Sequence, residues 1–187
     1  MTRAMDGFDV RGARVAVVGA ARSGVAAAEL LVRRGARVTL SDAKASITDA
    51  TRLTTVGVAL ELGTNDPAAV RVADLVVVSP GVPIELPALA VAQARGVPVI
   101  GELELAFRWL KGRVIAITGT KGKSTTTTLV GRMLSAAGRR VLVGGNIGVP
   151  LSAHVDASTE DTVHVVEASS FQCRTVISTT HAPPRTT

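Results

Sequence analysis

The chain has 187 residues, a length that fits one large or two small domains. Hydrophobic residues make up 47% of it and aromatic residues only 2%. A core of Val, Leu, Ile and Ala is therefore expected, and stacking platforms for RNA bases are poorly supported. The single cysteine, Cys173, excludes an internal disulfide and a cysteine-based zinc site.

The net charge of +6 is compatible with nucleic acid, but its scatter along the chain favours a solvated surface and a small anionic ligand. No apolar run approaches the roughly 18–20 residues of a membrane span, and residues 1–10 show no signal-peptide pattern. We therefore expect a soluble, cytoplasmic protein that binds neither nucleic acid nor membrane.

Strands and helices alternate along the first part of the chain. Strands are predicted at 14–18, 37–41, 58–62, 75–79 and 97–100, and helices at 24–34, 87–95 and 102–110. The run at 75–79 is continuously apolar, as in a strand buried on both faces, and Gly35 and Pro87 stand where helices end and begin. This alternation predicts a Rossmann-like α/β domain with a parallel sheet, over residues 1–112.

A second α/β unit is predicted over residues 113–172. Its strands are expected at 114–118, 140–143 and 162–166, with a helix at 124–137. The chain lays down few strands before the pattern fails, so we predict an incomplete P-loop domain. Residues 173–187 contain little apolar sequence and two adjacent prolines, which predicts a disordered tail.

The strongest motif is a glycine- and lysine-rich loop between a predicted strand and helix. It consists of Gly119, Thr120, Lys121, Gly122, Lys123, Ser124 and Thr125. Such a loop turns backbone N–H groups toward an anion, with Lys123 reaching phosphates and Ser124 offering its hydroxyl to Mg²⁺. The strict Walker A pattern requires glycine where this sequence has Ile117, so the loop is a shortened relative of it.

A weaker phosphate motif runs from Gly19 to Gly24, again between strand and helix. It departs from the dinucleotide fingerprint because Ala21 replaces the middle glycine. It indicates a nucleotide phosphate near Arg22 and Ser23, with Asp42 at the end of the next strand as a candidate ribose-binding acid. The turn Ser79, Pro80 and Gly81 also ends a strand, where ligands of open α/β sheets bind.

Polar residues follow two strands of the second unit. Glu167 comes directly after the strand at 162–166 and is a candidate magnesium ligand. Asn146 lies in a glycine-rich turn that could face the same crevice. The three histidines show no metal-ligand spacing, and His164 is expected to be a core or surface residue.

In order, these motifs read GxxxSG, SD, SPG, GTKGKST, GGNIG and ExSSFQ, and over about residues 8–172 they resemble the Mur ligases. The GGNIG and SSFQ motifs point to the members that add D-glutamate. The resemblance implies three domains, of which this chain would carry the UDP-binding domain and part of the ATP domain. It implies ATP-dependent ligation of D-glutamate to UDP-N-acetylmuramoyl-L-alanine through an acyl phosphate, by a protein expected to be monomeric.

The resemblance also assigns roles to residues. The loop from Gly119 to Thr125 would bind ATP, with Lys123 and Glu167 catalytic and with Ser124 and Glu167 holding Mg²⁺. The substrate would be bound by Arg22, Ser23, Asp42, Ser79, Pro80, Gly81, Asn146, Ser169 and Gln172.

Two departures qualify this assignment. Lys121 stands where many Mur ligases carry Asn, and Cys173-Arg174 replaces the usual Leu-Glu after Gln172. A frameshift or truncated gene would produce such a change, and we expect no ligase activity from the 187 residues alone. The alternatives are a nucleotide-binding fragment without activity, a folylpolyglutamate synthase-like ligase, and an NAD oxidoreductase, which Ala21 disfavours.

Overall fold

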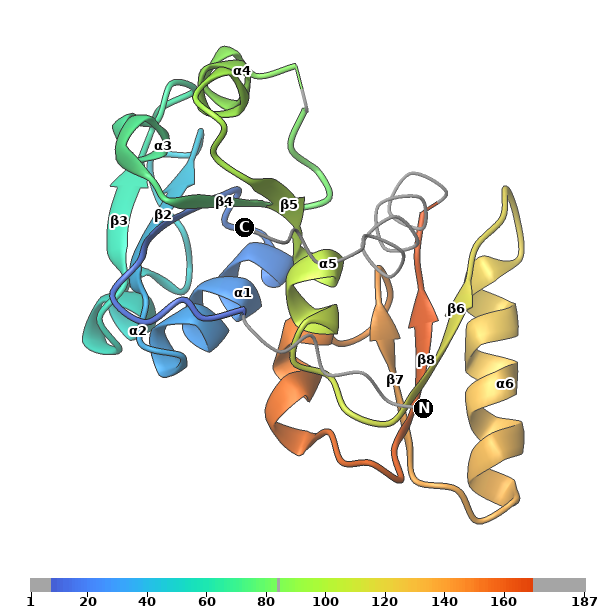
Figure 1. The fold of residues 1–187 in the computed structure, drawn as a ribbon. Coiled ribbons are helices and arrows are strands. Elements are labelled where there is room, and N and C mark those ends of the chain that lie inside the picture. Colours follow the sequence, from blue (N-terminus) through green and yellow to red (C-terminus); the bar gives the residue numbers. More distant parts are fainter. Residues whose placement is uncertain (1–7, 84, 170–187) are drawn as a thin grey trace. The chain divides into compact units, whose positions relative to one another are not determined.

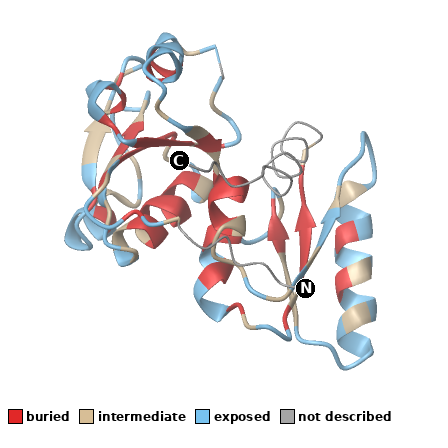
Figure 2. Cartoon of the chain, viewed as in Figure 1, coloured by how far each residue is buried: buried red, intermediate tan, exposed pale blue. Residues whose placement is uncertain are grey.

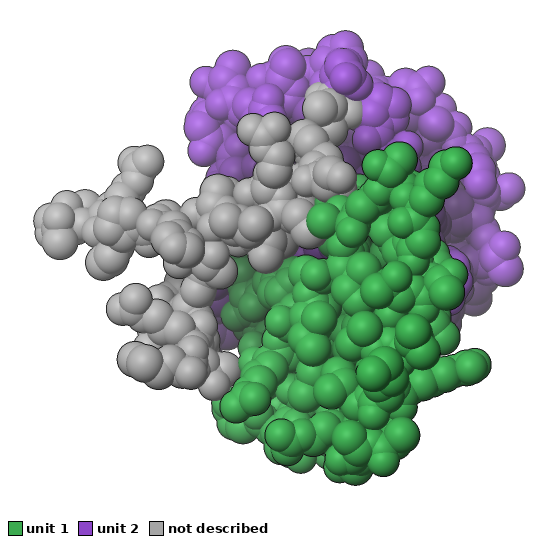
Figure 3. Space-filling model, turned by 90° about the vertical axis from the view of Figure 1, so that its right-hand side faces the viewer, with its two compact units in different colours: residues 1–5, 106–187 green, residues 6–105 purple. Residues whose placement is uncertain are grey.

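The computed structural model describes residues 8–83 and 85–169. The chain divides into two compact units (Figure 3), which we call the N-terminal unit (residues 6–105) and the C-terminal unit (residues 106–187 with 1–5). No helix in the described part of the chain is long and apolar enough to cross a membrane.

The N-terminal unit is built on a five-stranded parallel sheet in the order β3-β2-β1-β4-β5 (Figure 1). Its strands are β1 (Arg14–Val18), β2 (Arg37–Asp42), β3 (Ala59–Leu62), β4 (Leu75–Val78) and β5 (Val99–Gly101). Its helices are α1 (Arg22–Arg33), α2 (Ala50–Thr55), α3 (Ala68–Val72) and α4 (Pro87–Ala94), and α5 (Glu102–Phe107) spans the unit boundary. This strand order confirms the predicted Rossmann-like fold.

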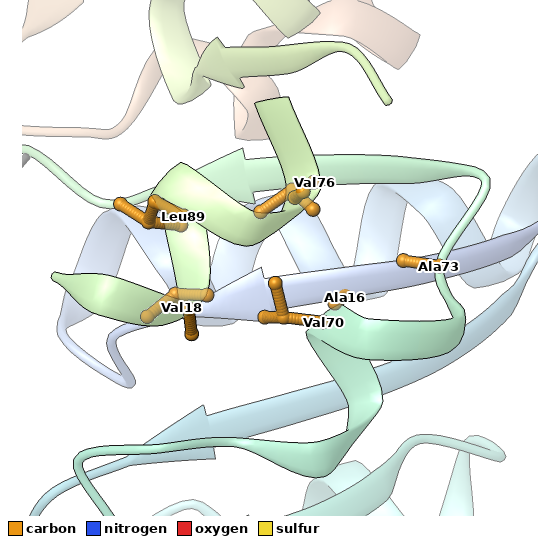
Figure 4. Close-up of a cluster of buried hydrophobic side chains, with 8 residues drawn as sticks. Ala16, Val18, Val70, Ala73, Val76 and Leu89 are labelled. Atoms are coloured by element: carbon orange, nitrogen blue, oxygen red, sulfur yellow. The ribbon is translucent and has the colours of Figure 1, made fainter. Parts of the chain in front are cut away.

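Helices cover both faces of this sheet, with α1 and α2 on one side and α3 and α4 on the other (Figure 1). The apolar runs of β1 and β4 are buried because they occupy the middle of the sheet. On the α3 and α4 side, Val18, Val76 and Leu89 belong to one buried cluster (Figure 4). This packing fixes the carboxyl ends of β1 and β4 in place, and the loops that follow these ends contain the predicted motifs.

The C-terminal unit contains a three-stranded parallel sheet in the order β6-β8-β7. Its elements are β6 (Arg113–Ile117), α6 (Lys123–Ala136), β7 (Val141–Gly145), the 3₁₀ helix η1 (Leu151–Ala157) and β8 (Val163–Glu167). The α6 helix and η1 lie on opposite sides of the sheet (Figure 1). The central strand, β8, is the most buried, whereas Ile115 of the edge strand β6 is 38% exposed (Figure 2).

The predicted strands are all present, and their ends agree with the prediction to within two residues. Three short helical segments were not predicted: α2, α3 and η1. They span five to seven residues, too few to show a helical repeat of apolar positions. The prediction for residues 173–187 lies outside the described residues.

Candidate functional site

The loop between β1 and α1 is held by side chains from two neighbouring strands. Ser79, directly after β4, is buried and donates its hydroxyl to the carbonyl oxygen of Gly19 at 2.7 Å. Asp42, the last residue of β2, accepts the N–H of Ala20 at 2.6 Å and that of Lys44 at 2.9 Å. The two side chains therefore fix this loop to the carboxyl edge of the sheet.

The loop begins and ends with glycines, Gly19 and Gly24, because a side chain at either position would be strained or would clash. An ideal Cβ at Gly24 would lie 1.8 Å from the Gly19 carbonyl oxygen and 2.5 Å from the Ser79 hydroxyl oxygen. Gly19 itself has φ +95°, a backbone conformation that residues with a side chain rarely adopt. Close packing of α1 on β1 thus explains both glycines without any ligand.

Two hollows open beside this loop. One, of about 200 Å³, is lined mainly by apolar side chains from the strand ends: Val18, Gly19, Ser41, Asp42, Ala43, Thr64, Asn65, Pro67, Gly81, Val82, Pro83 and Leu86. The other, of about 580 Å³, is more polar and is lined by Ala20, Ala21, Arg22, Asp42, Lys44, Ser46, Ile47, Thr48 and Asp49. Asp42 lines both, so the two hollows meet at the end of β2.

The basic side chains of Arg22 and Lys44 line the larger hollow. The first turn of α1 follows the same loop, and the structure records no acceptor for the N–H groups of residues 22–24 within the described residues. Unpaired N–H groups at a helix start, together with two cations, suit an anionic group such as a diphosphate.

In the C-terminal unit, the loop between β6 and α6 has the form of a phosphate-binding loop. Gly122 precedes α6 in the left-handed conformation, at φ +76°. Lys123 donates its ammonium group to the carbonyl oxygen of Gly119 at 2.8 Å, so it folds back over its own loop. Thr126 N–H bonds to the Gly122 carbonyl oxygen, and among the described residues no acceptor is seen for the N–H groups of residues 123–125, which leaves them for another acceptor.

The parallel register brings three motifs to one edge of this sheet. Ile117 and Gly145 both pair with Glu167, the last residue of β8. The Ser124 hydroxyl donates to the Glu167 carboxylate at 2.7 Å, and the N–H of Asn146 donates to the Glu167 carbonyl oxygen at 3.0 Å. Glu167 is only 5% exposed. The loop, the carboxylate and the glycine turn therefore meet at one point.

The predicted residues thus gather in two groups, one in each unit. Arg22, Asp42 and Gly81 line the hollows, with Ser23 and Pro80 beside them in sequence. Ser79 contacts the loop backbone. Ser169 follows Glu167 by two residues, and Gln172 lies outside the described residues.

Other hollow-lining residues were missed by the sequence interpretation. Thr64 and Asn65 line the apolar hollow, and Lys44 lines the polar one. They belong to loops without a recognisable motif, and only their position after predicted strands could have identified them.

Two family models match parts of this chain. A family model for the MurD-like N-terminal domain of Mur ligases matches residues 13–101, and one for the Mur ligase middle domain matches residues 117–184. The second match continues through part of the segment predicted to be a tail.

Curated relatives include UDP-N-acetylmuramoylalanine–D-glutamate ligases from Koribacter versatilis (46% identical) and Acidobacterium capsulatum (49% identical). Each match covers 90% of this chain but only 38% and 37% of the relative, respectively. This chain therefore spans just over a third of their length.

A solved structure with a similar fold is a pseudomurein peptide ligase type C from Methanothermus fervidus. It is 25% identical with a TM-score of 0.51, over 86% of this chain and 33% of that one. The two domain matches and the named relatives identify the family. The chain belongs to the Mur ligase family.

Proposed function

We propose that the residues of this chain serve an ATP-dependent ligase that joins D-glutamate to UDP-N-acetylmuramoyl-L-alanine in peptidoglycan synthesis. The observation that carries the proposal is the meeting of the phosphate loop, Ser124 and Glu167 at the carboxyl edge of the β6-β8-β7 sheet. Relatives about half identical to the chain bear the name of this ligase. In this proposal residues 1–112 form the substrate domain and residues 113–172 part of the ATP domain.

The ATP side of the reaction is phosphoryl transfer, which depends on positioning and charge neutralisation. The N–H groups of residues 119–125 would hold the triphosphate, and the Lys123 ammonium group would leave the Gly119 carbonyl oxygen for a phosphate oxygen. The Lys121 side chain is exposed on the same loop and adds positive charge. A carboxylate oxygen of the substrate attacks the γ-phosphorus, the bond to the β-phosphate oxygen breaks, and ADP leaves.

The Ser124 hydroxyl and the Glu167 carboxylate are hard oxygen donors 2.7 Å apart, which suits Mg²⁺. When bound, the ion would neutralise charge on the phosphate oxygens. The described residues contain no group of three or more His, Cys, Asp or Glu side chains that could hold a metal without such help. ATP phosphates and water would therefore supply the remaining ligands.

The hollows of the N-terminal unit would take the UDP part of the substrate. The diphosphate suits the N–H groups of residues 22–24 and the cationic Arg22 and Lys44, and the uracil suits the apolar hollow. Gly81 in the apolar hollow and its neighbour Pro80 would contact the UDP part. Asn146, Ser169 and Gln172 would contact the muramoyl-alanine part. The amine of D-glutamate then attacks the acyl carbon, phosphate leaves, and the nitrogen loses a proton.

A monomeric state and a cytoplasmic location remain predictions, as does the absence of ligase activity from these 187 residues alone. The second candidate, a nucleotide-binding module without ligase activity, rests on the same phosphate loop. The two differ in the ligands that the chain should bind: binding of UDP-N-acetylmuramoyl-L-alanine by the N-terminal unit supports the ligase, whereas binding of ATP alone supports the module.

Titration of the 187-residue chain with ATP and Mg²⁺ tests the phosphate loop. Lys123→Ala removes a charge-assisted contact, so we expect the Kd for ATP to rise about 10- to 100-fold. The matched control is Lys111→Ala, which removes an exposed lysine side chain outside the loop. Equal ATP affinity of the wild-type chain and the Lys123 variant would refute the assignment.

A further inference from the structure

We propose that Ser79 is a positioning residue that orients the phosphate-binding loop of the N-terminal unit without itself binding the substrate. The inference rests on the proposed binding of UDP to this unit. It changes the role that the sequence alone assigns to Ser79, from a ligand contact to a contact that shapes the site.

The Ser79 side chain has little access to a ligand. The residue is only 3% exposed, and its hydroxyl donates to the Gly19 carbonyl oxygen at 2.7 Å. A hydroxyl carries a single proton, so this bond uses its donor capacity. The remaining lone pairs cannot attract an anionic diphosphate, because they are themselves electron-rich.

The bond from Ser79 acts on a peptide group that is held at both ends. The Gly19 carbonyl oxygen and the Ala20 N–H belong to one planar peptide unit. Ser79 from β4 binds the oxygen, and Asp42 from β2 binds the N–H at 2.6 Å. Because the unit is planar, these two bonds from opposite sides of β1 fix its rotation.

The fixed peptide sets the direction of the N–H groups that follow it. Ala21 precedes α1 in an extended conformation, and no side chain caps the helix start. The structure records no acceptor for the N–H groups of residues 22–24 within the described residues. These groups therefore keep their binding direction only as long as the peptide before them cannot rotate.

The packing around Ser79 supports this role. Its backbone N–H bonds to the Val18 carbonyl oxygen at 2.9 Å, which anchors the residue to β1. An ideal Cβ at Gly24 would lie 2.5 Å from the hydroxyl oxygen, so the start of α1 rests directly on it. Removal of the hydroxyl leaves a buried carbonyl oxygen without a donor and a gap under the first helical turn.

Titration calorimetry of the 187-residue chain with UDP and with uridine tests the proposal. For Ser79→Ala we expect the Kd for UDP to rise about five- to tenfold, the equivalent of one neutral hydrogen bond, and the Kd for uridine to stay within twofold. Ser158→Ala is the matched control. It removes another buried hydroxyl that donates to a backbone carbonyl, in the C-terminal unit, and should change neither Kd.

The outcomes separate the inference from the function on which it rests. No UDP binding by the wild-type chain would overturn the proposed substrate domain, and the role of Ser79 with it. Wild-type binding with an unchanged UDP affinity in Ser79→Ala overturns only the positioning role. An equal loss for UDP and uridine also overturns it, because general loosening of the unit would explain the result.

A second variant covers the case in which Ser79→Ala does not fold. Ser79→Cys keeps a side chain of similar shape with a weak donor, so circular dichroism should match that of the wild-type chain. We expect it to lose UDP affinity while keeping uridine affinity. A folded Cys variant with wild-type UDP affinity would contradict the proposal.

Discussion

The tightest contact in the N-terminal unit predicts the effect of Gly24→Ala. The new methyl carbon would lie 1.8 Å from the Gly19 carbonyl oxygen, where an ordinary carbon–oxygen contact needs about 3.2–3.5 Å. Neither backbone can yield cheaply, because Gly19 and Gly24 are both buried. The substitution should therefore push α1 away from β1 and break the bond between Ser79 and Gly19.

The magnitude follows from three terms. Overpacking of a buried site costs about 1–3 kcal/mol. The lost hydrogen bond to Gly19 costs about 0.5–1.5 kcal/mol. Alanine in place of glycine in a helix returns at most about 1 kcal/mol. The N-terminal unit should therefore lose about 0.5–3.5 kcal/mol of unfolding free energy, and UDP affinity should fall with the displaced loop.

Hydrogen exchange measured by mass spectrometry suits this test, because it reports each unit separately. Peptides from β1 and β4 should exchange faster in Gly24→Ala, while those from β8 should not change. Gly101→Ala is the matched control, since a Cβ there meets nothing within 4 Å and its φ is not positive. Wild-type exchange in β1 and β4 of the Gly24 variant would refute the steric argument.

Other predictions concern stability and ionisation. Burial lowers the pKa of His164, so below the ordinary histidine pKa of about 6.5 the unfolded chain binds more protons than the folded chain. In urea unfolding, the stability of the C-terminal unit should therefore fall as the pH is lowered below about 6.5, and it should fall less in His164→Asn. The hydrogen bond from Arg14 lowers the pKa of Asp74 to about 2, and NMR titration of Arg14→Gln should find it raised toward 3.8. Leu89→Ala in the buried cluster should cost about 2–5 kcal/mol in chemical denaturation, whereas Leu129→Ala, 55% exposed, should stay within about 0.5 kcal/mol.

The fold could be predicted where local pattern and tertiary environment agree. The strand at β4 is apolar at every position because both faces are buried, and Gly35 ends α1 at φ +84° as a C-terminal glycine should. The short helices α2 and α3 could not be predicted, because their five or six residues gain their stability from contacts with the sheet. Glu61, for example, accepts two N–H groups at the start of α3 across seven and eight residues.

The register explains why the candidate residues of the C-terminal unit lie close together. Ile117, Gly145 and Glu167 are far apart in sequence, but parallel strands begin and end together, so their loops meet at one edge. The motif alone did not give the contact between Ser124 and Glu167, because a pattern specifies residue types and order but not which side chains touch. The hydrogen bond between Ser124 and Glu167 depends on the strand register, which places the loop that leads to Ser124 beside Glu167.

A sequence pattern also cannot tell whether Ser79 and Asp42 bind the ligand or hold the binding loop in shape. A ligand-binding loop and the residues that hold it in shape occupy the same strand ends, and both sets need small or polar side chains. Burial and hydrogen-bond direction separate them: Ser79 donates inward to a buried carbonyl oxygen, whereas Arg22 is exposed on the hollow. Substitution of Arg22 and substitution of Ser79 should therefore change the salt dependence of UDP binding differently. The loss of Arg22 should weaken UDP binding more at low salt than at high salt, because salt screens the ionic contact that is lost. The loss of Ser79 should weaken UDP binding equally at low and high salt.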